Sequence, residues 1–156
     1  MRRAGEKARQ RVVGSPWSLS SVQGPQINKT QFDKILAFIR AGEEEGAVLE
    51  AGGRRHGDLG YFVQPTVFSG VEDTMRIARE EIFGPVQSIL KFSSLEEVIQ
   101  RCNDTEYGLA AGILTRQPEY LARKLKYILK LFLYFNSCHF NFHANIQPGL
   151  GIWTRD

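Results

Sequence analysis

A chain of 156 residues is long enough for one domain with a hydrophobic core, and 42% hydrophobic with 24% charged residues is an ordinary globular composition. Two cysteines are too few for a disulfide framework and fit a reducing compartment, so we expect a cytoplasmic protein. The most apolar run, residues 128–135, contains Lys130 and is too short for a membrane span, which needs about 20 residues. The cysteine count excludes a disulfide scaffold. The length of the apolar run excludes a membrane span there, and we expect no membrane partner.

The net charge of +3 comes largely from the N-terminus, where five basic residues face only Glu6: Arg2, Arg3, Lys7, Arg9 and Arg11. Such a run suits nucleic-acid binding, a targeting signal or the solvated face of a helix. Charge runs are usually solvated surface, and no aromatic residues interleave here to stack on single-stranded bases. We therefore expect a short helix over residues 4–13 with a solvated basic face and no nucleic-acid partner.

The segment after residue 27 has the apolar spacing of a helix with one buried face. Asn28 is a suitable N-cap, and Gln31 three residues later completes a capping box. Gly42 is expected to end the regular pattern, with the glutamates after it in solvent. The predicted buried stripe is Phe32, Ile35, Leu36 and Ile39.

Strand candidates alternate with helices along the rest of the chain. The candidates are residues 47–50, 61–63, 66–68, 86–92 and 110–115. Pro65 makes the 61–68 region either an edge strand or two short pieces. A second capping box, Ser94 with Glu97, begins a helix that is expected to reach Gly108, and Pro118 begins another. This alternation predicts an α/β domain with a mainly parallel sheet and flanking helices, followed by an irregular tail.

Neither cysteine is a convincing catalytic or metal-binding residue. Cys102 lies on the apolar stripe Leu95, Val98, Ile99, Cys102, toward the end of its helix, which favours a buried structural thiol over a nucleophile. Cys138, His139 and His143 lack a fourth ligand and a rigid frame, so we expect no metal site. Phosphate-binding glycine loops and the common hydrolase and zinc motifs are absent from the sequence.

The run from Arg79 to Val86, REEIFGPV, is the most informative segment. Glu80 and Glu81 point opposite ways in extended chain, which makes them a poor acid–base pair. A single carboxylate on a loop at the end of a strand can instead accept hydrogen bonds from ribose hydroxyls, and α/β folds hold nucleotides at such loops. Phe83 would lie on the same side as Glu81 and pack against a flat ring. The alternative is a buried turn with a structural glutamate.

Several blocks along the chain, in order, resemble the NAD-dependent aldehyde dehydrogenases, most closely the retinal-type and mitochondrial class. The blocks include GPQI at 24–27, QFDKIL at 31–36, GYFVQPTVF at 60–68, MRIAREEIFGPV at 75–86 and YGL at 107–109. The resemblance covers residues 2–124 and implies the fold of a partial catalytic domain. It also implies, for the full-length relative, oxidation of an aldehyde to a carboxylic acid with NAD, with NADP left open.

The resemblance assigns cofactor contacts to four residues. Glu81 corresponds to the glutamate that binds the ribose next to nicotinamide, and Phe83 to the phenylalanine that touches the nicotinamide. Gln31 and Lys34 correspond to residues that approach the adenosine ribose. For Gln31, this role stands beside its capping role.

Other parts of the family pattern are missing. The family's nucleophilic cysteine, general-base glutamate and Rossmann domain lie upstream of the matched region, and neither Cys102 nor Cys138 lies in a nucleophile motif. We expect residues 125–156 to be a divergent tail, and the chain to be a truncated or alternatively spliced product or a gene-model artefact, with no catalytic residues and no activity alone. The alternative is a non-catalytic fragment that associates with full-length subunits through homo-oligomer contacts. A mitochondrial parent is the alternative to a cytoplasmic one.

Overall fold

The computed structural model describes residues 1–107 and 152–155, and the chain divides into two units, residues 1–91 with 147–156, and residues 92–146. The described part contains one four-stranded sheet in the order β1-β2-β3-β4. Its strands are β1 (Val48–Ala51), β2 (Thr66–Ser69), β3 (Val86–Phe92) and β4 (Ile152–Arg155). β1 pairs antiparallel with β2, and β2 pairs parallel with β3. The predicted α/β class is confirmed, with a mixed sheet.

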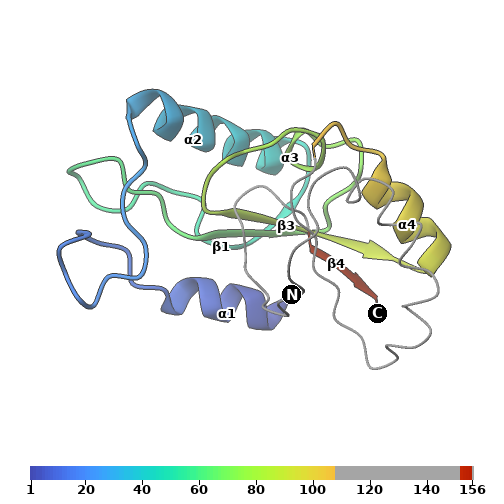
Figure 1. The fold of residues 1–156 in the computed structure, drawn as a ribbon, viewed down its shortest axis with the longest axis horizontal. Helices are drawn as coiled ribbons and strands as arrows, with labels where there is room; N and C mark the ends of the chain where they lie inside the picture. The colour runs from blue at the N-terminus through green and yellow to red at the C-terminus, as the bar shows by residue number, and fades with distance from the viewer. Residues whose placement is uncertain (108–151, 156) are drawn as a thin grey trace, which may run out of the picture. The chain divides into compact units, whose positions relative to one another are not determined.

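Two helices, α1 (Arg2–Gln10) and α2 (Lys29–Glu44), lie on opposite faces of this sheet (Figure 1). Successive strand residues point to opposite faces, so β1, β2 and β3 each contribute to both hydrophobic clusters. On the α2 side the buried cluster includes Ile35, Phe38, Ile39, Phe68, Val86 and Leu90. On the α1 side Ala51, Val67 and Ile89 pack with Ala4 and Ala8. The short strand β2 is therefore buried on both faces.

Helix α2 begins as predicted, because the Asn28 side chain accepts a hydrogen bond from the Gln31 backbone N–H at 2.9 Å. Its end differs from the prediction. Gly42 lies inside the helix and is buried, and a Cβ built on it would approach Ile77 Cδ1 to 2.9 Å. The glycine thus allows close packing against α3 (Arg76–Arg79) and does not end the helix. In the stripe, Phe32, Ile35 and Ile39 are buried as predicted, Leu36 is half-buried, and Phe38 is an additional buried residue.

Pro65 divides its region into two short pieces. Val63 forms an isolated bridge with Arg55, and the chain then enters β2. Because β2 lies between β1 and β3, the edge-strand alternative is wrong. Pro65 stands just before the strand, where it removes no ladder hydrogen bond. The predicted strand over residues 86–92 is confirmed, whereas the single turn of α3 was too short for its periodicity to be recognised.

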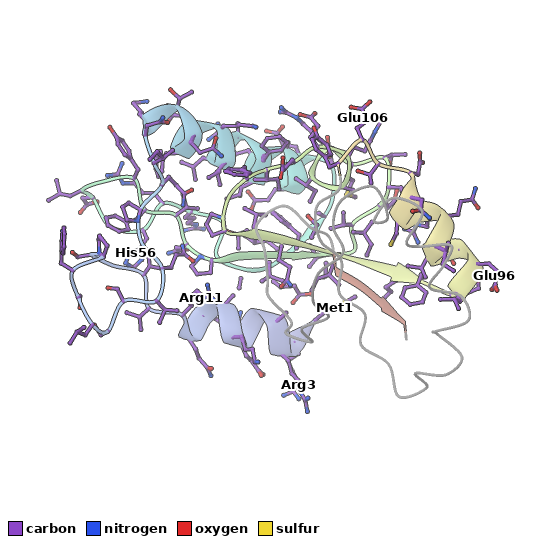
Figure 2. The ribbon with its side chains drawn as sticks, in the orientation of Figure 1. Met1, Arg3, Arg11, His56, Glu96 and Glu106 are labelled. Carbon is purple, nitrogen blue, oxygen red and sulfur yellow. The ribbon has the colours of Figure 1, made fainter. Side chains whose placement is uncertain are left out.

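The predicted helix α1 is confirmed. It begins two residues earlier than predicted, at Arg2, and ends at Gln10. Its arginines are exposed, and Figure 2 shows Arg3 pointing from α1 away from the sheet. Arg2 pairs with Glu6 at 3.4 Å, and Arg9 Nη1 donates to the Glu50 backbone carbonyl at 2.7 Å. Among the helices that the structure describes, none is long and apolar enough to cross a membrane.

In the second unit, α4 (Leu95–Asn103) ends before the predicted Gly108. Ser94 Oγ accepts from the Glu97 N–H at 3.1 Å as predicted, and the Glu97 carboxylate accepts from the Ser93 N–H at 2.9 Å. Of the predicted stripe, only Val98 is buried, and Cys102 is half-buried. Three predicted features lie outside the described residues, namely the strand at 110–115, the helix at Pro118 and the segment with Cys138, His139 and His143. Strand β4 lies in the segment expected to be irregular.

Candidate cofactor site

The loop from Glu80 to Pro85 is the last part of the connection between β2 and β3. Because these strands are parallel, the connection runs back from the end of β2 to the start of β3. Thr66 pairs with Val86 at the amino ends of both strands, and the Thr66 N–H donates to the Pro85 carbonyl at 2.8 Å. The loop thus lies at the amino ends of these strands, directly ahead of β3.

The side chain of Gln31 joins the first turn of α2 to this loop. Its Nε2 donates to the Ile82 carbonyl at 3.2 Å and to the Phe83 carbonyl at 2.8 Å. The Asn28 half of the predicted capping box is confirmed, but the Gln31 half is wrong, because this side chain turns away from the helix start toward the loop. Two segments about fifty residues apart in sequence are thereby held together.

Close packing strengthens the same contact. Ile82 is only 2% exposed and belongs to the buried cluster under α2. A Cβ built on Gly84 would approach Ile35 Cδ1 to 2.5 Å, so the loop backbone passes directly over the Ile35 side chain. Gln31 and Ile35 lie one turn apart on α2, and the loop is therefore fixed to one face of that helix.

Phe83 has an unusual backbone conformation. Its φ is +56°, and no other non-glycine residue in the described part of the chain has a positive φ. The left-handed region costs about 1–2 kcal/mol for a residue with a side chain. The ring is 64% exposed, so burial of the ring does not explain the conformation. Strain with an exposed aromatic ring is typical of a site where function specifies the conformation.

The two adjacent glutamates have different surroundings. Glu80 accepts from Arg76 Nε at 2.9 Å and from Arg76 Nη2 at 3.3 Å, one turn apart along the chain. The hydrogen bond from Arg76 holds the pKa of the Glu80 carboxyl below its usual range, and the charges of Lys34 and Arg79 act in the same direction. Glu81 is half-buried, and among the described residues its carboxylate has no hydrogen-bond or ion-pair partner. Its oxygens are therefore available to a ligand's hydroxyl groups.

Lys34 follows Gln31 by one turn of α2 and is exposed. Its Nζ lies 5.6 Å from the centre of the Phe38 ring, and the Arg76 guanidinium lies 4.3 Å from the same centre. Two cations thus border this ring, which is 1% exposed. Arg76 also donates its backbone N–H to the Glu45 carboxylate at 2.7 Å, so one of the glutamates expected to be only solvated caps α3.

The available groups fit a nucleotide better than a metal or a covalent step. An unpaired carboxylate suits ribose hydroxyls, an exposed ring suits a flat ring, and a lysine donates to hydroxyl oxygens. No group of three or more potential metal ligands occurs in the described ranges. His56 lies exposed in the loop between β1 and β2 (Figure 2). Sequence reasoning missed Glu45 and Gly84, whose partners lie far away in the sequence, and Arg76, which pairs with Glu80 one turn along and also bonds Glu45.

Comparison with known proteins identifies relatives of this chain. A family model described as "Aldehyde dehydrogenase family" matches residues 1–151. The chain belongs to the aldehyde dehydrogenase family. The predicted family is therefore confirmed, and with it a relationship to oxidoreductases. The match extends beyond residue 124, while the division into residues 2–124 and 125–156 stays a prediction.

Individual relatives share much of the chain's sequence. Aldehyde dehydrogenase 1A1 of Mesocricetus auratus is 60% identical over 116 residues, which cover 74% of this chain and 23% of that protein. Retinaldehyde dehydrogenase 3 of Rattus norvegicus is 51% identical over 149 residues, 96% of this chain and 29% of that protein. An NAD+ complex of the Bacillus cereus aldehyde dehydrogenase matches with a TM-score of 0.76 and 41% identity, over 79% of this chain and 25% of that one. The chain thus spans about a quarter of these aldehyde dehydrogenases.

Proposed function

We propose that this chain supplies one wall of an NAD site. The Glu81 carboxylate binds the ribose next to nicotinamide, Phe83 packs against the nicotinamide ring, and Gln31 and Lys34 contact the adenosine ribose. The observation that carries this proposal is the pair of hydrogen bonds from Gln31 to the loop carbonyls, which brings both groups of residues to one place. The family, and a similar solved structure described as an NAD+ complex, support NAD as the cofactor.

A full-length relative would use this wall in the oxidation of an aldehyde, with NAD and water, to a carboxylic acid, NADH and a proton. NAD supplies the hydride acceptor in that reaction. The role of the residues present here is to bind and orient the dinucleotide. We further propose that a polypeptide of these 156 residues does not catalyse the oxidation, because Cys102 lies toward the C-terminal end of α4 and neither cysteine lies in a motif like the family's nucleophile.

Cofactor binding can be tested by calorimetric or NMR titration of the purified chain with NAD. Glu81→Gln keeps the size of the side chain but removes its charge, so we expect about tenfold weaker binding, the usual loss for a hydrogen bond to a charged group. Glu44→Gln changes an exposed glutamate on α2 and serves as the control. Equal NAD affinity in the original chain and in Glu81→Gln would contradict the assignment.

Activity is tested separately, by following NADH absorbance with the purified chain, NAD and a simple aldehyde such as propanal. We expect no turnover above that of a heat-denatured sample. Sustained NAD-dependent oxidation would refute the proposed inactivity, and a Cys102→Ser variant would then show whether that thiol takes part.

A second candidate function is association with full-length aldehyde dehydrogenase subunits. It is favoured by large apolar side chains that the described structure leaves in solvent, namely Trp17 at 93%, Leu59 at 86% and Ile27 at 86% exposure. Such residues suit a protein contact. Co-precipitation of the tagged chain with a co-expressed retinaldehyde dehydrogenase subunit tests this function. The Trp17→Ser variant should reduce the yield, and recovery of none of the subunit with the original chain would eliminate this candidate.

We propose the cytoplasm as the location of the protein. Two of the similar proteins are named cytosolic aldehyde dehydrogenases, at 59% and 57% identity. These names support a cytosolic over a mitochondrial parent. Fractionation of cells that express the chain would test the assignment.

A further inference from the structure

We propose that Gln31 is a positioning residue, whose carboxamide sets the backbone conformation of Phe83 and so presents the exposed ring. This inference rests on the proposed NAD site, in which Phe83 contacts the nicotinamide, and it adds a role to Gln31 beyond contact with the dinucleotide.

The two carbonyls that Gln31 binds belong to the two peptide groups on either side of Phe83. The Ile82 carbonyl is part of the preceding peptide group, and the Phe83 carbonyl is part of the following one. The orientations of these two groups define φ and ψ of Phe83. One side-chain amide therefore holds both backbone dihedrals of the residue that has φ +56°.

The chemistry of the contact also fixes the orientation of the carboxamide. Both partners are carbonyl oxygens, which only accept hydrogen bonds, so the NH2 group must face the loop. Its two hydrogens suffice for the two carbonyls. The oxygen Oε1 remains for a ligand, and Gln31 can then contact a ribose only as an acceptor. The loop and a ribose use different atoms, so Gln31 can serve both at once.

The surrounding contacts leave Phe83 as the part of the loop that needs this support. Ile82 is anchored in the buried cluster, Gly84 packs over Ile35, and Pro85 accepts from the Thr66 N–H. Phe83 has an exposed ring and lies between these anchored residues. The φ of Phe83 is strained, and a strained φ persists only where the surroundings hold it. Without the Gln31 donor on its two peptide groups, we expect the backbone of Phe83 to relax.

NMR of the isotope-labelled chain, without cofactor, tests the inference, because the amide N–H groups of Phe83 and Gly84 belong to the same two peptide groups. Gln31→Met removes the donor at similar size, and we expect both amide signals to shift or broaden. Gln10→Met, at the end of α1, is the matched control. Unchanged Phe83 and Gly84 signals in Gln31→Met, with β2 signals showing a folded sheet, would overturn the proposal.

The Gln31→Glu variant makes the contact depend on pH, an effect that is not expected if Gln31 has a purely structural role. An ionised carboxylate cannot donate to either carbonyl, whereas the protonated acid donates one hydrogen bond. We expect the Phe83 and Gly84 signals of this variant to return toward those of the original chain as the side chain is protonated, which Gln31→Met cannot do. A Gln31→Glu variant with no such recovery would contradict the inference.

An NAD titration of the same variants separates this inference from the proposed function. Because Gln31 is also proposed to contact a ribose, weaker NAD binding in Gln31→Met supports positioning only where the Phe83 and Gly84 signals change as well. Altered loop signals in a chain that binds no NAD would support positioning and refute the proposed site. An unaltered loop in Gln31→Met would refute positioning whatever the NAD affinity, and normal NAD binding in that variant would also refute the proposed contact of Gln31 with the ribose.

Discussion

Gly84 lies against Ile35, so closely that a Cβ on Gly84 would come within 2.5 Å of Ile35 Cδ1 and 2.6 Å of Ile35 Cγ1. Ile35 is fully buried, and its side chain has no room to withdraw. The contact requires a residue without a side chain at position 84. It sets the distance between the loop and α2, and with it the distance between Gln31 and the carbonyls that it binds.

Gly84→Ala should therefore destabilise the chain. Forcing one extra carbon into a packed contact typically costs about 1–3 kcal/mol. Urea unfolding, monitored by circular dichroism, should show a lower midpoint. Gly24→Ala is the matched control, because a Cβ at Gly24 meets nothing within 4 Å. A Gly84→Ala midpoint equal to that of the control would show that the loop does not pack on Ile35.

At position 83, glycine should be more stabilising than alanine. Both substitutions remove the ring, which is largely exposed, but only glycine adopts φ +56° without strain. We expect the free energy of unfolding of Phe83→Gly to be about 1 kcal/mol higher than that of Phe83→Ala. At an exposed helical site such as Arg40 the order should be reversed, since glycine destabilises helices. The same order at both sites would mean that Phe83 is not left-handed in solution.

Periodicity and local signals predicted the elements of this fold more reliably than its contacts. The Asn28 cap, the buried face of α2 and the strand over residues 86–92 follow from signals within a few residues. The wrong predictions for Gly42 and Gln31 have a common cause, because the partners of both residues, Ile77 and the loop carbonyls, are more than thirty residues away. The single turn of α3 is shorter than the window in which a helical period can be detected.

In the candidate site, too, local signals predicted less of the contacts than of the elements. The adjacency of Glu80 and Glu81 predicted that they point opposite ways, and in the structure Arg76 pairs with Glu80 and not with Glu81. Nothing local predicts a left-handed Phe83, since phenylalanine rarely adopts that conformation. The cofactor roles of Gln31, Lys34, Glu81 and Phe83 came from the family resemblance, and they stay predictions until NAD binding is measured.

Glu45→Ala should destabilise the packing of α3. Its carboxylate accepts the first backbone N–H of that helix, and loss of such a cap typically costs about 1 kcal/mol. Glu44→Ala is the control, because Glu44 is an exposed neighbour and the first N–H of α3 is bonded to Glu45. Thermal or urea unfolding of both variants provides the comparison. Equal effects of the two substitutions would argue that the cap contributes nothing.

The ion pair of Arg76 with Glu80 predicts a pH dependence. Since Arg76 lowers the pKa of Glu80 in the folded chain, the stabilisation is present above the unfolded pKa of about 4.3 and is lost as pH falls through the lower folded value. The pair is solvent-exposed, so its contribution to stability is small. Arg76→Gln should raise the Glu80 pKa in an NMR titration of the carboxyl carbon. Arg40→Gln should leave that titration unchanged, and a shift in this control instead would indicate a general charge effect.

Thr66→Val should be costly although the two side chains have the same shape. Thr66 Oγ1 accepts from the Gly53 N–H at 2.9 Å and donates to the Gln64 carbonyl at 2.8 Å, at a position 2% exposed. Valine leaves both groups without this partner, which typically costs about 1–3 kcal/mol. Thr66→Ser keeps the hydroxyl and should recover most of that loss in urea unfolding. Valine and serine variants of equal stability would mean that water replaces the hydroxyl.

The connection from β2 to β3 is fixed at its far end and less constrained at its beginning. The segment from Ile82 to Pro85 is held by Gln31, Ile35 and Thr66, whereas Glu72, Asp73 and Thr74 are exposed. Relatives should therefore gain or lose residues near Asp73 without moving Phe83, because β-strand pairing and α2 set the loop's position independently of the length before it. Insertions between Ile82 and Pro85 should be eliminated by selection. The loop could in this way keep its geometry while the surface next to it diverges among enzymes.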